Sequence, residues 1–368
     1  MQNFDIIRSV ELSDSFRARS TIDMFTISDE KVSEHFKGEF DLDFDWNVGC
    51  IVGASGTGKT TVAKELFGDG YIVDFDYKEK SVLDDMPKDA DLKTIHKAFT
   101  SVGFSSPPDW LKPYSVLSNG QKMRVDLARS LLEDIEIVAF DEFTSVINRE
   151  VAKTGSLAIQ KAVRKDNKKF IAITVHRDIL DWLQPDWIFD TDDFKFHSRG
   201  LLWQRPDIKL QVFESPKNIK QKFWKPLSKY HYLDNKLHTA ARQFIGVIDD
   251  VVVAHTSYIQ FPMKKGWKRE HRLVVHPDYQ GIGIGTRFQK AVAQIVYDEG
   301  FTVICSTTTP ALVNAMIRDK DWFLYRFGRG KNTMKSFDRK YGNGKSEHLE
   351  DKKSNKRNTY SFCFRGRK

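Results

Sequence analysis

The sequence predicts an α/β protein made of two successive domains, and three observations lead to this. Short apolar runs alternate with helical patterns from residue 48 to residue 190, which is typical of a mostly parallel sheet covered by helices. A glycine-rich segment, GASGTGKT at residues 53–60, follows one apolar strand and opens a helix. A second glycine-rich segment, QGIGIG at residues 280–285, lies among hairpins that indicate an antiparallel sheet.

The first domain is expected to span residues 1–205 and the second residues 210–368. The boundary falls in a polar stretch that contains Pro206 and Pro216. In the first domain, helices are expected to begin at Gly58, near Asn119 and near Arg149. The strands expected there are VGCIVGA, YIVDF, IEIVAF, KFIAITV and DWIFD.

In the second domain, the segment FIGVIDDVVVAHTSYI predicts a hairpin that turns at Asp249 and Asp250. A strand (HRLVVH) and a helix from about Gly283 should follow. A strand (FTVICST), a helix (PALVNAMIRD) and a strand near FLYRF complete the expected order. This order indicates an α/β layer built on an antiparallel sheet.

The composition is that of an ordinary folded protein, with 40% hydrophobic and 29% charged residues among 368. No apolar run approaches the roughly 20 residues needed to span a bilayer. The first residues, MQNFDIIRSVELSDSF, lack the basic-then-apolar pattern of a secretion signal. Cys50, Cys305 and Cys363 are too widely separated for a disulfide framework or a metal site. We therefore expect a cytoplasmic protein with no membrane partner.

The positive charge is concentrated at the end of the chain. Residues 331–368 hold 12 Lys and Arg against 4 Asp and Glu, so this basic segment accounts for the whole formal charge of +8. Such a segment attracts polyanions, and nucleic acid is the expected partner; the alternative is a solvated, partly disordered end. The interleaved aromatic residues would suit base stacking, although TYSFCF also alternates like a strand whose rings are core. These aromatic residues are Phe337, Tyr341, Tyr360, Phe362 and Phe364.

The first glycine-rich segment predicts a site for the phosphates of ATP. Its glycines allow the backbone to curl so that N–H groups point at phosphate oxygens, and the helix N-terminus adds partial positive charge. Lys59 would neutralise the β- and γ-phosphates, and Thr60 would bind Mg²⁺. The residues expected to contact the nucleotide are Gly53, Ser55, Gly56, Thr57, Gly58, Lys59, Thr60 and Thr61.

Three further motifs follow in a fixed order. IEIVAFDE places Asp141 to hold the Mg²⁺ shell and Glu142 to polarise a water for attack on the γ-phosphate. LSNGQ, at residues 117–121, begins a helix whose N-terminal N–H groups and Ser118 form another anion site. His176 follows an apolar strand.

This order of motifs resembles the ABC-type ATPases. The resemblance implies that Ser118, Gly120 and Gln121 cover ATP bound to a second copy of the chain, which makes a homodimer through the ATPase domain. It also implies that His176 contacts the γ-phosphate.

The chain departs from this pattern in three ways. Asn119 replaces a glycine and would have to tolerate a left-handed turn. Asn148 stands where the family usually has Asp, and no glutamine occurs between Thr60 and Gln121. The segment between those motifs is also short, which favours a soluble ABC protein over a transporter.

The second glycine-rich segment belongs to V-x-H-P-D-Y-Q-G-x-G-x-G, which resembles motif A of the GNAT acetyltransferases. The resemblance implies that main-chain N–H groups cradle the pyrophosphate of acetyl-CoA or another acyl-CoA. It also implies that the preceding strand pairs with the pantetheine arm. The residues expected to bind this cofactor are Leu273, Val274, Val275, Gln280, Gly281, Ile282, Gly283, Ile284, Gly285 and Thr286. Glu270 and His271, on the strand leading into the loop, are the candidate bases.

The pairing of domains resembles fusions of an ABC ATPase with a GNAT domain. We expect an ATP-hydrolysing ATPase coupled to an acyl-CoA-dependent acyltransferase that modifies nucleic acid, either DNA or tRNA. One alternative is a protein or small-molecule N-acetyltransferase regulated by an ATPase clamp. Another is a DNA-clamping ATPase whose CoA fold is not catalytic.

Overall fold

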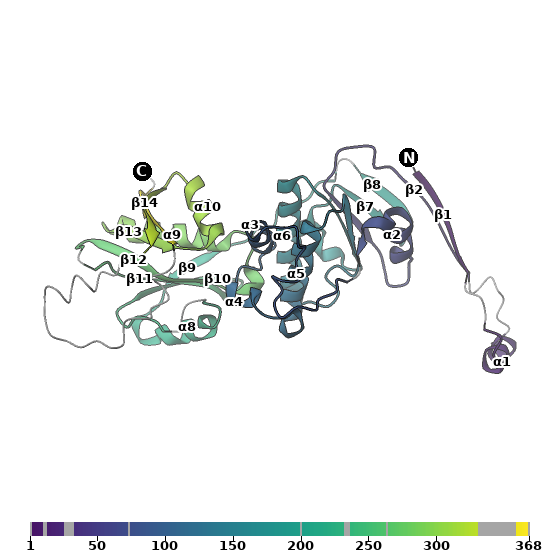
Figure 1. Ribbon diagram of the computed structural model, residues 1–368, viewed down its shortest axis with the longest axis horizontal. Coiled ribbons are helices and arrows are strands. Elements are labelled where there is room, and N and C mark those ends of the chain that lie inside the picture. Colours follow the sequence, from purple (N-terminus) through teal and green to yellow (C-terminus); the bar gives the residue numbers. More distant parts are fainter. Residues whose placement is uncertain are drawn as a thin grey trace. The chain divides into compact units, whose positions relative to one another are not determined.

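The computed structural model describes residues 2–9, 13–25, 33–72, 74–198, 201–231, 236–262, 264–329 and 358–366. It divides the chain into two compact units. Unit 1 comprises Met1–Val102 and Lys112–Pro206, and unit 2 comprises Gly103–Leu111 and Asp207–Lys368. Figure 1 shows the helices and strands of each unit.

Unit 1 contains a six-stranded sheet in the order β4-β5-β6-β3-β7-β8. The first five strands of that order are parallel, and β8 joins the edge in the antiparallel direction. The strands are β3 (Val48–Val52), β4 (Tyr71–Ile72), β5 (Ile137–Phe140), β6 (Lys169–Thr174), β7 (Trp187–Asp190) and β8 (Lys195–Ser198). The mostly parallel sheet is confirmed, but the expected strand YIVDF is reduced to the two residues of β4.

After β3, unit 1 contains the helices α2 (Lys59–Phe67), α3 (Leu92–Ser101), α5 (Asn119–Leu132), α6 (Arg149–Asp166) and α7 (Leu180–Leu183). Three of them, α2, α5 and α6, begin where the sequence predicts, and the sequence did not predict α3 and α7. Helix α6 packs against β3 and β6, and its inward face is almost wholly buried. The core beneath the sheet is rich in aromatic rings, among them Phe40, Trp187 and Phe189.

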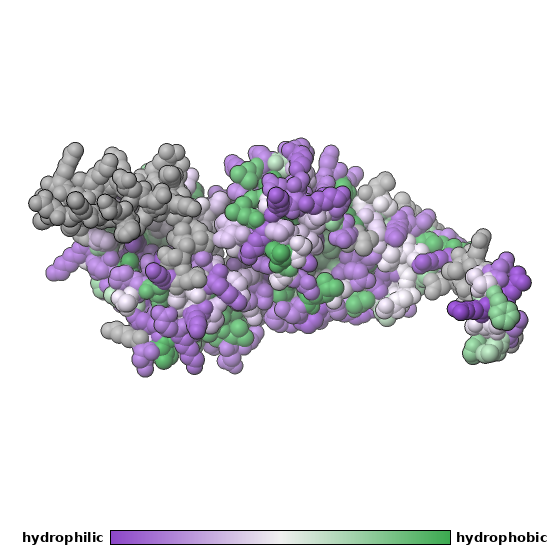
Figure 2. Space-filling model, turned by 60° about the horizontal axis from the view of Figure 1, so that its bottom comes forward, coloured by the Kyte–Doolittle hydropathy of each residue, from purple (hydrophilic) through white to green (hydrophobic). Residues whose placement is uncertain are grey.

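A separate antiparallel ribbon, β1 (Gln2–Ser9) with β2 (Ser33–Phe40), precedes the sheet. Between its strands in sequence lies α1 (Phe16–Phe25), none of whose residues is buried. Figure 2 shows hydrophobic atoms on the surface of this helix, at the right of the view. The exposed large hydrophobic side chains of α1 are Phe16, Met24 and Phe25.

Unit 2 contains a seven-stranded sheet in the order β14-β15-β13-β12-β11-β10-β9. Its strands are β9 (Gln211–Glu214), β10 (Arg242–Ile248), β11 (Val251–Gln260), β12 (Trp267–Val275), β13 (Thr302–Thr307), β14 (Trp322–Arg329) and β15 (Asn358–Phe364). The helices are α4 (Pro107–Trp110), α8 (Lys220–Ser228), α9 (Ile284–Asp298) and α10 (Pro310–Arg318). Figure 1 shows α9 and α8 on opposite faces of this sheet.

The hairpin between β10 and β11 turns at Asp249 and Asp250, as predicted. Both residues have positive φ, 46° and 63°, the geometry of a tight type I′ turn.

The end of the chain corrects one expectation. Strand β15 inserts between β13 and β14, and the rings of Phe362 and Phe364 are 1% and 2% exposed. The prediction that these two rings stack on bases is therefore wrong, because the alternation in TYSFCF is that of a core strand. Phe337 and Tyr341 lie outside the described residues.

Candidate functional site

The loop between β3 and α2 has the shape of an anion cradle. Gly56 and Gly58 have φ values of 83° and 85°, a left-handed conformation that side-chain-bearing residues rarely adopt. Gly58 precedes the first turn of α2, and no side chain caps the helix there, so its N–H groups are available to an anion. The side chain of Lys59 is folded along the loop, and its Nζ donates to the carbonyl of Ala54 at 2.6 Å.

The carboxylates around Lys59 offset only part of the effect of its burial on its pKa. Burial lowers the pKa of its ammonium, and the carboxylates of Glu142, Asp141 and Asp192 act in the opposite direction. A cation held between a phosphate loop and three carboxylates fits a nucleotide that arrives with a metal ion.

Thr60 and Asp141 meet at the end of β5. The hydroxyl of Thr60 donates to Oδ2 of Asp141 at 2.8 Å, and the hydroxyl of Tyr71, on β4, donates to the same oxygen. These oxygen ligands, a hydroxyl and a buried carboxylate beside a phosphate loop, are of the kind that Mg²⁺ prefers. The structure thus brings together the two residues predicted to bind the metal. It also adds Tyr71, which no motif indicated.

Glu142 and His176 lie in one polar cluster after the strands. Oδ1 of Asp141 accepts from the N–H of Glu142 at 2.8 Å, and Thr144 Oγ1 lies 3.1 Å from Nδ1 of His176. Glu142 and Thr144 have φ values of 51° and 73°, which is strained for residues with side chains, and most of all for a β-branched one. Burial, followed by the nearby Arg149 guanidinium, lowers the pKa of His176, so this imidazole is neutral near pH 7.

The LSNGQ segment forms a capped helix start. Ser118 accepts from the N–H of Gln121, and Oε1 of Gln121 accepts from the N–H of Ser118 at 3.0 Å, so the two form a reciprocal capping box. A Cβ on Gly120 would lie 3.0 Å from Val151 Cγ1, which explains why the smallest residue occupies this position.

The structure accounts for both asparagine departures. Asn119 is the first residue of α5 and is not left-handed, so the expected left-handed turn is wrong. Its Nδ2 instead donates to the carbonyl of Val146 at 3.3 Å. Asn148 caps α6 by accepting from the N–H of Val151 at 2.9 Å, a role that Asn and Asp perform equally well.

In unit 2, the second glycine-rich loop forms another cradle. Gly281 and Gly283 have φ values of 85° and 89°, and a Cβ built on Gly283 meets nothing within 4 Å. The side chains of Ile282 and Ile284 are both 4% exposed, so they anchor the loop while its glycines leave the main chain accessible. The hydroxyl of Thr286 donates to the carbonyl of Gly283 at 3.0 Å.

Strand β12 offers an edge beside this loop. Its parallel pairing with β13 covers only Trp267, Lys268 and Arg269, so the described pairing stops before Leu273, Val274 and Val275. Gln280 fixes the loop to the end of the strand, because its Nε2 donates to the carbonyl of Val275 at 2.9 Å. Its Oε1 accepts from the N–H of Ser105, in the segment Gly103–Leu111 of the same unit, at 3.2 Å. A split between two parallel strands is suited to an extended ligand that hydrogen-bonds the free edge.

The two candidate bases differ sharply in environment. Glu270 is partly buried beneath α9 and accepts three bonds, from Thr256 Oγ1 at 2.9 Å, Gln289 Nε2 at 2.6 Å and Cys305 Sγ at 2.8 Å. Burial raises the pKa of this carboxyl group, and the three donors oppose the rise. His271 is the extra residue of a bulge, because Arg272 and Glu270 pair with consecutive residues of β11. Both residues are partly exposed, and the three donors to its carboxylate distinguish Glu270 from His271.

Comparisons with known proteins give matches of two kinds. The model of the acetyltransferase (GNAT) family matches residues 209–318. A putative ABC transporter ATP-binding protein of Clostridium perfringens is 40% identical over 67 residues, 18% of this chain and 11% of that protein. The ABC-type transporter MDR1 of Aureobasidium melanogenum is 32% identical over 98 residues, 24% of this chain and 7% of that protein. The chain thus spans only a small part of these relatives.

Solved structures show weaker likeness. The dimeric post-hydrolysis ATP-binding cassette MJ0796, bound to ADP and Pi, gives a TM-score of 0.37 at 16% identity, covering 46% of this chain and 94% of that one. The IAA acetyltransferase of Bacillus cereus gives 0.30 at 10% identity, covering 42% and 99%. At these scores the structural likeness supports no conclusion of its own.

The family match and the sequence relatives, with the motifs, identify the two parts. The chain joins an ABC-type P-loop ATPase domain to a C-terminal α/β domain of the GNAT acetyltransferase family. Both are domains of enzyme classes. Among the described residues, no helix has the length and apolar character needed to cross a bilayer.

Proposed function

We propose that this protein hydrolyses ATP in its first domain, residues 1–205, and transfers an acyl group from acyl-CoA in its second, residues 210–368. The observation that supports this is the presence of two separate loops, each with two left-handed glycines ahead of a helix. Main-chain amides at such loops bind phosphate groups. A triphosphate suits the first loop, which Lys59 accompanies, and a CoA pyrophosphate suits the second.

In the ATPase, Thr60 and Asp141 would hold Mg²⁺, which supplies charge neutralisation on the phosphates. Glu142 would orient the attacking water, and neutral His176 would donate to the γ-phosphate. Ser118, Gly120 and Gln121 would complete the site of a second copy, so ATP would favour a homodimer.

In the acyltransferase, the cradle around Gly283 would hold acyl-CoA, and the free edge at Leu273–Val275 would orient its arm. His271 would take the proton from the attacking amine or hydroxyl. We propose nucleic acid, DNA or tRNA, as the acceptor, because the net charge of +8 comes from residues 331–368. ATP would close two copies around the polymer and present a base to the acyl donor.

Two substitutions test the ATPase. Lys59→Ala should abolish MgATP binding. Glu142→Gln should retain ATP and accumulate a dimer on size exclusion in MgATP, because binding survives while the water is no longer activated. Normal hydrolysis by Glu142→Gln would show that the role proposed for that carboxylate is wrong.

Mass spectrometry of nucleosides tests the acyltransferase. Cells that express the protein should contain an acylated nucleoside that is absent from cells expressing Gly283→Asp. Acylated proteins or small molecules in cells whose nucleosides are unmodified would point instead to a regulated N-acetyltransferase. Failure to bind acyl-CoA in a thermal-shift titration would favour a DNA-clamping ATPase without acyl transfer.

The basic segment cannot be tested by deleting it, because its last part forms the core strand β15. Replacing the lysines and arginines of residues 331–357 by glutamine keeps that strand. This change should abolish transfer to nucleic acid and spare acyl-CoA binding. Unchanged transfer would exclude the segment from acceptor recognition.

A further inference from the structure

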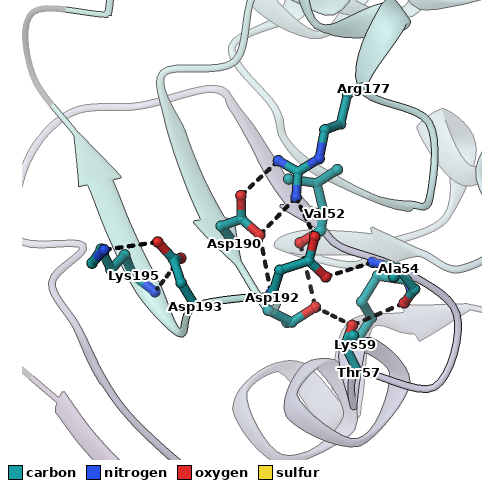
Figure 3. Close-up of polar contacts among 10 residues, drawn as sticks. Val52, Ala54, Thr57, Lys59, Arg177, Asp190, Asp192, Asp193 and Lys195 are labelled. Carbon is teal, nitrogen blue, oxygen red and sulfur yellow. Dashed lines mark hydrogen bonds and ion pairs between the residues drawn. The ribbon is translucent and has the colours of Figure 1, made fainter.

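The turn after β7 lies directly against the phosphate loop (Figure 3). Oδ1 of Asp192 accepts from the N–H of Ala54 at 2.7 Å, and the hydroxyls of Thr57 and Thr191 are 2.5 Å apart. A Cβ on Gly53 would lie only 2.2 Å from Oγ1 of Thr191. Residues more than 130 positions away in sequence therefore support the base of the loop.

A single guanidinium holds this turn. Arg177 forks onto both oxygens of Asp190, at 2.6 and 2.9 Å, and its Nη2 also donates to Oδ2 of Asp192 at 2.7 Å (Figure 3). The N–H of Asp192 donates to Oδ1 of Asp190 at 3.0 Å. Arg177 directly follows His176 in sequence.

Both carboxylates are ionised. The bond from Arg177 lowers the pKa of Asp190, and the bonds from Ala54 and then Arg177 lower the pKa of Asp192. Two negative charges thus stand beside a loop whose proposed ligand is a triphosphate. Without a nearby positive charge, these two carboxylates would repel the triphosphate, because like charges repel each other within a Debye length.

We propose that Arg177, Asp190 and Asp192 form a positioning unit of the ATP site. Arg177 cancels one of the two negative charges beneath the phosphate loop, Asp192 holds the amide of Ala54, and the same arginine fixes the chain at His176. This inference rests on the proposed binding of ATP. Arg177 needs no contact with ATP and acts through the two carboxylates.

The test is a set of MgATP titrations by calorimetry on the full chain, at low and at high salt. Arg177→Gln should weaken MgATP binding by about tenfold at low salt, and less at high salt, because the exposed charges are screened. Adding Asp192→Asn to this variant should restore the affinity to within about twofold, since the amide oxygen can still accept from Ala54 while one charge is removed. Arg177→Lys keeps the charge but loses the two-pronged contact with Asp190. Its MgATP affinity should lie between those of Arg177→Gln and the unsubstituted chain.

Asp193→Asn is the matched control. Asp193 lies in the same turn and pairs with Lys195 at 2.9 Å, away from the phosphate loop, so its removal should leave MgATP affinity unchanged (Figure 3). Thermal unfolding without nucleotide checks that each variant is folded.

A merely structural bridge predicts the opposite pattern. The double variant would then bind MgATP more weakly than Arg177→Gln alone, and that result would overturn the inference. Wild-type affinity in Arg177→Gln would overturn it too. If the unsubstituted chain binds no MgATP, the proposed function itself fails.

Discussion

Helix α5, which begins at the LSNGQ segment, should become less stable as pH rises from about 5 to about 7.5, because of Asp126. Tyr77 and Tyr114 stack at 3.9 Å, and their hydroxyls donate to the two oxygens of Asp126 at 2.7 and 2.8 Å. Burial raises the pKa of this carboxyl group to about 6, from 3.8, although the two hydroxyls oppose the rise. The folded chain therefore binds a proton that the unfolded chain has already released.

The sign and size follow from this difference. Because the folded pKa is the higher one, stability decreases as pH rises through the window from about 4 to about 6. At pH 5 part of this stabilisation has already disappeared. Between pH 5 and pH 7.5 the remainder disappears, which amounts to about one pKa unit or roughly 1.4 kcal/mol of unfolding free energy. That energy corresponds to about a tenfold fall in the protection of α5 amides against hydrogen exchange.

The assay is hydrogen exchange with mass spectrometry on peptides from α5, corrected for the intrinsic exchange rate at each pH. Asp126→Asn removes the titration and should give protection that does not depend on pH. Asp166→Asn, which breaks a surface pair with Lys97 on α3, controls for the loss of a charge. Wild-type protection that does not change with pH would refute the reasoning, and so would an equal fall in the Asp126→Asn variant.

Three other outcomes are expected. Gly53→Ala should weaken MgATP binding by at least about tenfold in a titration, because its Cβ would overlap Thr191 and move the loop; unchanged affinity would contradict the close approach. Gly283→Asp should abolish acyl-CoA binding in a thermal-shift assay, because the new side chain would have to adopt left-handed backbone geometry and would bring a negative charge into the cradle. Lys290→Gln on the same helix serves as the folded control. Phe362→Ala should destabilise unit 2 by about 3–5 kcal/mol in denaturant, because the ring is buried in the core; a loss under about 1 kcal/mol would show that β15 is dispensable.

The sequence predicted the parts of each site that depend on neighbouring residues. The starts of α2, α5 and α9, the turn at Asp249 and Asp250, and the left-handed glycines of both loops follow from local rules. Glycine is favoured where φ is positive, and a helix start exposes its own N–H groups, so a short run of letters is enough to indicate a phosphate cradle.

Other expectations depended on the environment, because a single residue type can suit more than one environment. Asn119 was expected to be left-handed, but it is the first residue of a right-handed helix and bonds to Val146. Glu270 stays a candidate base, and only the structure shows that its carboxylate accepts bonds from Gln289 and Cys305. From the sequence, Phe362 suits base stacking as well as it suits a core strand. The position of β15 between β13 and β14 shows that this residue belongs to the core.

The sequence by itself determined that two amide-lined loops exist, because they are encoded by runs of only eight and six consecutive residues. Only the tertiary structure decided what surrounds them. Tyr71 reaches Asp141 across 70 positions, and Asp192 reaches Ala54 across 138, through side chains that have no local signature. Such contacts depend on which strands become neighbours in the sheet, and strand order is set by the packing of the whole domain rather than by any segment of it.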